Sequence, residues 1–145
     1  MATKRHALAA VASCDAIYAV GGWEDGRRCS GVVEVYDAAA DVWRTRAPML
    51  LPRRLHGLAL LGGHIYAFGG ASDEQVDIKE AERLCLESDK WESICPLPAA
   101  ACTSAAAVGG YVYVMLWGKS VYRFDPTSSG IKSLKQSLHT ALIQP

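Results

Sequence analysis

Residues 17–22 read Ile-Tyr-Ala-Val-Gly-Gly, and residues 65–70 return to this pattern as Ile-Tyr-Ala-Phe-Gly-Gly, 48 positions later. A short run of β-branched and aromatic residues that ends in two glycines is typical of a buried β-strand followed by a tight turn. The same offset relates further pairs along the chain: Arg5 and Arg53, Glu34 and Glu82, Trp43 and Trp91. A repeat of this length predicts a chain built from similar structural units.

A third and weaker copy follows the second at an offset of 47. Gly109-Gly110 and Tyr113 repeat an earlier double glycine and tyrosine, but the glycine pair that should close the strand has become Trp117-Gly118. Phe124 then stands where the first repeat has a tyrosine, and Ile131 stands where the other repeats have tryptophan. We therefore divide the chain into repeats at residues 1–49, 50–97 and 98–134, with a non-repeat tail at residues 135–145.

Each repeat contains four segments that read as strands. The first is apolar and made of small residues, which suits the innermost strand of a ring in which neighbouring units converge. The second is aromatic and β-branched, the third alternates in polarity, and the fourth carries the tryptophan. About 50 residues in four strands match one blade of a β-propeller. The prediction is an all-β chain of three four-stranded antiparallel blades, with the first three strands at residues 7–11, 17–20 and 32–36, then 57–61, 65–68 and 82–86, then 104–108, 112–115 and 121–124.

These residues resemble the kelch repeat, which is marked by a double glycine after the second strand, a tyrosine about fourteen residues later and a tryptophan seven after that. Gly21-Gly22, Tyr36 and Trp43 carry the marks in the first repeat. The second repeat has Gly69-Gly70, Leu84 in place of the tyrosine, and Trp91. The glycine pairs, Trp43, Trp91, Tyr18, Tyr66 and Tyr113 are accordingly assigned to the scaffold.

Two sequence motifs, Val-Glu-Val-Tyr-Asp at residues 33–37 and Pro-Arg-Arg at residues 52–54, look most like those of the kelch-like proteins. In that family a BTB domain and a linker domain precede a six-bladed propeller, and the proteins are substrate adaptors of cullin-RING ubiquitin ligases. The 145 residues contain neither amino-terminal domain. The resemblance implies a protein-interaction scaffold whose propeller binds a ubiquitination substrate. The alternatives are an actin-binding kelch protein and a propeller enzyme such as the copper radical oxidases.

Composition narrows the classes of partner. Fifteen Lys and Arg balance fifteen Asp and Glu, which predicts no nucleic-acid partner and no anionic membrane surface. No apolar run approaches the roughly 20 residues that span a bilayer. Five cysteines without a C-x-x-C pair favour reduced thiols and a cytoplasmic location. No catalytic or metal-ligating motif is present with its partner residues, so we expect no enzyme activity, no metal and no cofactor.

Three repeats are fewer than the four to eight blades that usually close a propeller ring. An incomplete propeller leaves blade edges and an apolar blade face exposed. We therefore expect the carboxyl-side half of a longer propeller, or a truncated or alternatively spliced product. The alternative is self-association of two chains into a six-bladed ring. In either case the isolated chain should be marginally stable or oligomeric, and a sharply melting monomer would contradict this expectation.

Propellers usually bind partners through loops gathered on one face. The family resemblance places there the loop after each double glycine and the start of each inner strand. Trp23 beside Arg27 and Arg28 combines a large anchor with fork-shaped donors for carboxylates, so we hypothesise a basic patch that receives an acidic segment of a partner. Arg5 and Arg53 recur at the repeat spacing, and their alternative role is structural pairing between blades. The candidate binding residues are Arg5, His6, Trp23, Glu24, Arg27, Arg28, Arg53, Arg54, Asp73, Glu74 and Gln75.

Overall fold

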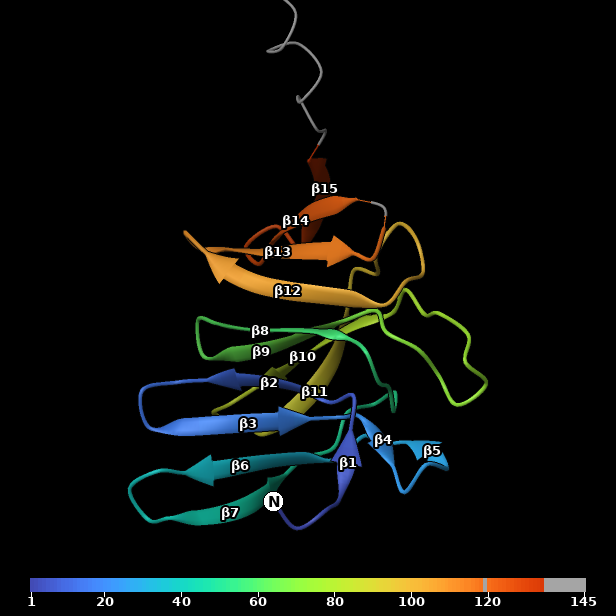
Figure 1. Ribbon diagram of the computed structural model, residues 1–145. Helices are drawn as coiled ribbons and strands as arrows, with labels where there is room; N and C mark the ends of the chain where they lie inside the picture. Colours follow the sequence, from blue (N-terminus) through green and yellow to red (C-terminus); the bar gives the residue numbers. More distant parts are fainter. Residues whose placement is uncertain (119, 135–145) are drawn as a thin grey trace, which may run out of the picture.

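The computed structural model describes residues 1–118 and 120–134, and every regular element in them is a β-strand (Figure 1). Three antiparallel sheets of four strands follow one another along the chain, and in each sheet neighbouring strands are consecutive apart from the inserted short hairpin of the first. The prediction of an all-β chain forming an incomplete propeller is therefore confirmed. The tail set apart at residues 135–145 lies outside the described residues.

We call the three sheets blades 1, 2 and 3. Blade 1 consists of β2 (Ala9–Ala12), β3 (Ala16–Val20), β6 (Val33–Asp37) and β7 (Val42–Arg46). Blade 2 consists of β8 (Gly57–Leu61), β9 (His64–Phe68), β10 (Ala81–Cys85) and β11 (Lys90–Ile94). Blade 3 consists of β12 (Thr103–Val108), β13 (Tyr111–Leu116), β14 (Val121–Asp125) and β15 (Gly130–Leu134). A helix long and apolar enough to cross a membrane is absent from the described residues.

The blades are stacked face to face, with blade 2 in the middle (Figure 1). The inner strand β8 contacts both β2 and β12, so the inner strands of the three blades lie side by side. Because side chains alternate along a strand, each strand of blade 2 serves two cores. Ile65 and Leu84 pack toward blade 1, whereas Tyr66 and Phe68 pack toward blade 3.

The two repeat tryptophans have different surroundings. Trp91 is buried between blades 1 and 2, and its indole N–H donates to the Ala47 carbonyl oxygen at 2.8 Å. Trp43 is 38% exposed and packs on Tyr36, with ring centroids 5.3 Å apart. It lies on the face of blade 1 that points away from blade 2, where the described residues supply no further blade. Only one of these two scaffold tryptophans therefore sits inside a blade interface.

Two details of the first repeat differ from the prediction. Residues 23–30, expected as a loop, contain a short hairpin of β4 (Trp23–Glu24) and β5 (Arg28–Cys29). This hairpin pairs with β1 (Arg5–His6) to form a separate three-stranded sheet. The inner strand was expected from residue 7 but begins at Ala9, because Ala7 has a φ of 53° and interrupts the extended chain between β1 and β2.

Candidate functional site

The ends of the blades gather at one side of the molecule, at the right of Figure 1. There the β4–β5 hairpin, which follows β3 of blade 1, lies beside the segment between β9 and β10 of blade 2. We call this surface the loop face. It is the surface on which the sequence placed the candidate binding residues.

Arg54, on the loop face, contacts both the β4–β5 hairpin and the loop of blade 2. Its guanidinium carbon stands 4.5 Å from the ring centroid of Trp23, which is a cation–π geometry. Its backbone exchanges hydrogen bonds with Ala71, at 2.9 and 3.2 Å, so the chain before blade 2 is tied to the loop that follows β9. The stacked pair holds Trp23 in a fixed, half-buried position.

Asp73 and Asp77 connect the loop of blade 2 to its neighbours. The Cys29 backbone N–H donates to the Asp73 carboxylate, and the Cys29 thiol donates to the Ala71 carbonyl oxygen at 3.3 Å. Burial, then the hydrogen bond and charge of Asp73, raise the pKa of Cys29 to about 11, which keeps this thiol protonated at neutral pH. On the other side, the Cys102 thiol lies 3.6 Å from the Asp77 carboxylate. The loop face is thus held together across all three blades.

The tip of the β4–β5 hairpin carries the most accessible arginines. The Arg28 side chain is 72% exposed, and its Nε lies 3.4 Å from the Glu24 carboxylate. Arg27 is exposed beside it, at the tip of the hairpin. His6, opposite Trp23 in the small sheet, is exposed as well. Asp73, Glu74 and Gln75 are exposed in the loop of blade 2, so the loop face places a basic tip beside an acidic loop.

Arg5 and Arg53 do not belong to this surface. Their side chains are 0% and 1% exposed, and they pair with Glu34 at 2.9 Å and Glu82 at 2.7 Å. Their placement among accessible binding residues was wrong, and their alternative role as structural pairs is the one that the geometry supports. The guanidinium reaches inward to satisfy backbone carbonyls, because a buried arginine needs partners for its donors.

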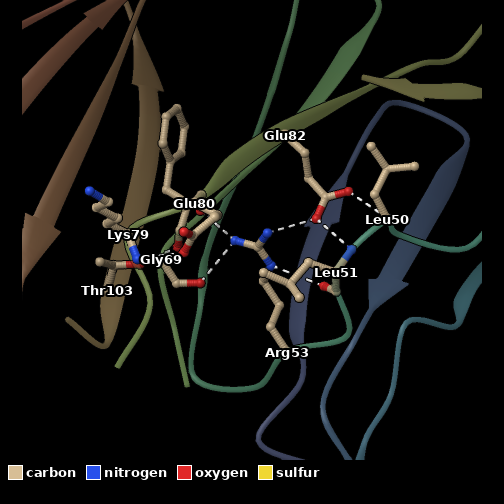
Figure 2. Close-up of polar contacts among 9 residues, drawn as sticks. Leu50, Leu51, Arg53, Gly69, Lys79, Glu80, Glu82 and Thr103 are labelled. Atoms are coloured by element: carbon tan, nitrogen blue, oxygen red, sulfur yellow. Dashed lines mark hydrogen bonds and ion pairs between the residues drawn. The ribbon is translucent and has the colours of Figure 1, made fainter. Parts of the chain in front are cut away.

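Figure 2 shows the second of these sites. Arg53 donates to the carbonyl oxygens of Gly69 at 3.0 Å and Glu80 at 2.6 Å, while the Glu82 carboxylate accepts from Arg53 and from the backbone N–H of Leu50 at 2.7 Å. The first repeat builds the same site with Arg5 and Glu34, whose carboxylate accepts from the Ala2 N–H at 2.6 Å. Each ion pair thus ties the segment that precedes the inner strand of its blade to the third strand of that blade, which is β6 in blade 1 and β10 in blade 2.

His56 is a buried residue that the sequence did not single out. It is 4% exposed, and neither ring nitrogen has a hydrogen-bond partner among the described residues. Its ring lies where blades 1 and 2 meet, beside Gly21. A Cβ on Gly21 would lie 2.7 Å from the ring carbon Cε1. Burial, followed by the positive charges of Arg53 and Arg5, lowers the pKa of His56 to about 3. The first repeat has Leu8 and the third has Thr103 at this position, so no repeated pattern marked it.

Lowering the pH from 7 to 5 should destabilise the chain through His56. Folded His56 stays neutral down to a pKa of about 3, whereas the unfolded residue takes up a proton near its ordinary value of 6.5. Between these values the unfolded state binds more protons, so stability falls with pH by up to about 1.4 kcal/mol per unit, or roughly 2 kcal/mol by pH 5. Urea unfolding at both pH values measures this slope. His56→Leu, which copies the first repeat, should flatten it; an unchanged slope in this variant would contradict the assignment.

No group of three or more His, Cys, Asp or Glu side chains within residues 1–118 and 120–134 is placed to hold a metal ion. The chemistry that the loop face offers is that of a binding surface: a fixed aromatic ring, two exposed guanidinium groups and a neighbouring acidic loop. Fixed aromatic and arginine side chains are the residue types that dominate the energetics of protein interfaces.

Comparison with known proteins agrees with this geometry. The family model described as the Kelch motif matches residues 4–50 and 52–98. Kelch-like protein 26 of Danio rerio is 33% identical over 92 residues, which are 61% of this chain and 15% of that protein. Kelch-like protein 36 of Rattus norvegicus is 31% identical over 104 residues, 68% of this chain and 16% of that protein. Kelch repeat and BTB domain-containing protein 2 of Homo sapiens is 38% identical over 82 residues, 55% and 13% respectively. The chain matches only 13–16% of the length of these relatives.

Proposed function

Because this chain belongs to the kelch-repeat family, whose propellers are protein-interaction modules, we propose that its loop face binds an acidic segment of a protein partner through Arg27 and Arg28. The observation that carries the proposal is the exposed arginine pair at the tip of the β4–β5 hairpin, and among the described residues such a hairpin occurs in the first repeat only. The hairpin is held in place by two contacts: β4 pairs with β1 in a three-stranded sheet, and Arg54 stacks on Trp23 of β4. A rigid support reduces the entropy that a binding loop loses on contact.

We further propose that the partner is a ubiquitination substrate and that the chain acts as part of the recognition propeller of a cullin-RING ligase adaptor in the cytoplasm. Support comes from relatives that are named kelch-like proteins and, in one case, a kelch repeat and BTB domain-containing protein. The five free thiols fit a reducing compartment. The parts of those relatives outside the matched region would supply any contact with the ligase.

Charge reversal of the hairpin tip tests the binding site. Arg27→Glu/Arg28→Glu should weaken binding to a fluorescent peptide rich in Asp and Glu by about tenfold or more, since losing and reversing two surface charge contacts removes roughly 1.4 kcal/mol or more. Fluorescence anisotropy at low and physiological salt measures the affinity, and the wild-type chain should bind more weakly as salt rises.

The matched control is Arg44→Glu/Lys90→Glu, which makes the same change of net charge on exposed residues of β7 and β11, away from the loop face. This variant should keep most of the affinity for the peptide. Equal losses in the two variants would show that net charge alone attracts the peptide, and unchanged binding in Arg27→Glu/Arg28→Glu would refute the site. Far-UV circular dichroism of both variants should match the wild type.

A further inference from the structure

Arg54 is an arginine of the loop face whose charge has no partner among the described residues. The buried arginines Arg5 and Arg53 each form an ion pair, whereas no carboxylate in the described part of the chain lies within ion-pair distance of Arg54. The Nε atom of Arg54 is buried and donates to no acceptor there. A cation without a counter-ion on a binding surface is suited to receive an anion from a partner.

The surroundings of Arg54 hold its guanidinium in place. The group stacks on the ring of Trp23, and the Arg54 backbone exchanges two hydrogen bonds with Ala71. Both side chains of the stack are partly buried. A guanidinium that is fixed in this way loses little conformational entropy on binding, and its planar fork matches the two oxygens of a carboxylate. We call Arg54 and Trp23 the stacked pair.

The stacked pair and the hairpin tip differ in their exposure to water. Arg27 and Arg28 are exposed, so their charges extend into the solvent. Arg54 is partly buried, and the ring of Trp23 covers one side of its guanidinium. Exposed charges at the rim of an interface mainly speed association, whereas charges that are shielded from water mainly slow dissociation. The hairpin tip is therefore suited to attract an acidic segment, and Arg54 is suited to hold it.

The loop of blade 2, on the other side of Arg54, has the opposite charge. Residues 71–78 contain Asp73, Glu74 and Asp77 and neither lysine nor arginine. Asp73 accepts from the backbone N–H of Cys29, which fixes this carboxylate next to the hairpin. An acidic residue of a partner over this loop would lie among three carboxylates and be repelled, and specific interfaces use such repulsion to exclude wrong partners. The acidic part of a bound segment should therefore end at Arg54.

We propose that the stacked pair anchors the last side-chain carboxylate of the partner's acidic segment, and that the segment becomes neutral or basic where it crosses the loop of blade 2. This inference rests on the proposed function, because the same segment contacts Arg27 and Arg28. The partner is thus recognised by a boundary in its charge and not by its acidity alone. Arg54 determines specificity, and Trp23 is the residue that positions it.

Stopped-flow fluorescence with the peptide rich in Asp and Glu tests the anchor. Arg54→Lys keeps the charge but loses the planar fork, so it should raise the dissociation rate about tenfold and leave the association rate nearly unchanged. Trp23→Leu removes the stack and should have the same effect, whereas Trp23→Phe keeps an aromatic ring and should restore most of the slow dissociation. Arg123→Lys is the matched control, because the Arg123 guanidinium carbon also lies over a ring, 4.3 Å from the centroid of Tyr111 in blade 3.

The outcomes separate the anchor from the proposed function. Equal dissociation rates in Arg54→Lys and Arg123→Lys would overturn the anchor, and a loss of binding in Arg27→Glu/Arg28→Glu would then leave the proposed function standing. A wild-type chain that does not bind the peptide overturns both. Far-UV circular dichroism shows whether each variant is folded. If Arg54→Lys is not, the comparison of Trp23→Leu with Trp23→Phe decides, and equal rates in these two variants count against the anchor.

Peptides in which the same acidic run is extended by two Glu, two Ser or two Lys residues, at one end or the other, test the charge boundary. At the end that reaches the loop of blade 2, the Glu extension should bind about threefold more weakly than the Ser extension, and the Lys extension should bind more tightly. Glu74→Lys, at an exposed position, should reduce this difference. Equal affinities of the three peptides at both ends, or an unchanged difference in Glu74→Lys, would overturn the boundary.

Discussion

Replacing Arg53 with methionine should destabilise the chain by about 3–5 kcal/mol, because the change leaves the Glu82 carboxylate buried without its counter-ion. The two side chains are 1% and 2% exposed, so water cannot take over the role of the guanidinium. The carbonyl oxygens of Gly69 and Glu80 lose their donor in the same variant. Methionine keeps most of the length of the arginine stem, so the loss reports on charge and hydrogen bonds more than on packing.

Urea unfolding at pH 7 measures this loss. Arg83→Met is the matched control, because Arg83 pairs with the exposed carboxylate of Glu92 and should cost less than about 1 kcal/mol. Adding Glu82→Gln to Arg53→Met removes the isolated charge and should recover part of the stability. A loss in Arg53→Met no larger than in Arg83→Met would refute a structural role for the buried pair.

The strands were predictable because their pattern is local and occurs more than once. The segment that includes Ile17 and its copy at Ile65 carry the same alternation, and both form strands within one or two residues of the expected bounds. The short hairpin at Trp23 was not predictable in this way. Strands of two residues show no periodicity, and their pairing with β1 joins residues far apart in sequence.

The candidate site could be predicted only in part from the sequence, because its contacts also join residues far apart in the chain. The partner of an arginine depends on which acid the fold brings within reach, and that information is not local. The recurrence of Glu34 and Glu82 at the same offset as Arg5 and Arg53 was the available signal, and it marks a repeated ion pair. The exposed residues near Arg28 do not repeat, so their surroundings became visible only in the folded chain.

The double glycine that first revealed the repeats supplies the second large effect: Gly69→Ala should destabilise the chain by about 3 kcal/mol or more. Gly69 has a φ of +57°, and a Cβ there would lie 2.7 Å from the Ala101 carbonyl oxygen and 2.9 Å from the Thr103 methyl carbon. The left-handed backbone costs an alanine roughly 1–2 kcal/mol. The clash with the backbone of the next blade adds a similar overpacking cost, because a main-chain carbonyl at the blade interface cannot move aside alone.

Gly62→Ala separates these two causes. Gly62 has the same φ of +57°, but nothing lies within 4 Å of the position that its Cβ would take, so this variant should lose only the conformational part. In the third repeat Leu116 stands at the position of Gly69, but it lies within the extended strand β13 and has no positive φ, so a residue with a Cβ fits there. Urea unfolding of the two alanine variants measures the difference. Equal losses would mean that backbone conformation alone requires glycine, whereas a larger loss in Gly69→Ala shows that the glycine is needed for the close approach of blade 3 to blade 2.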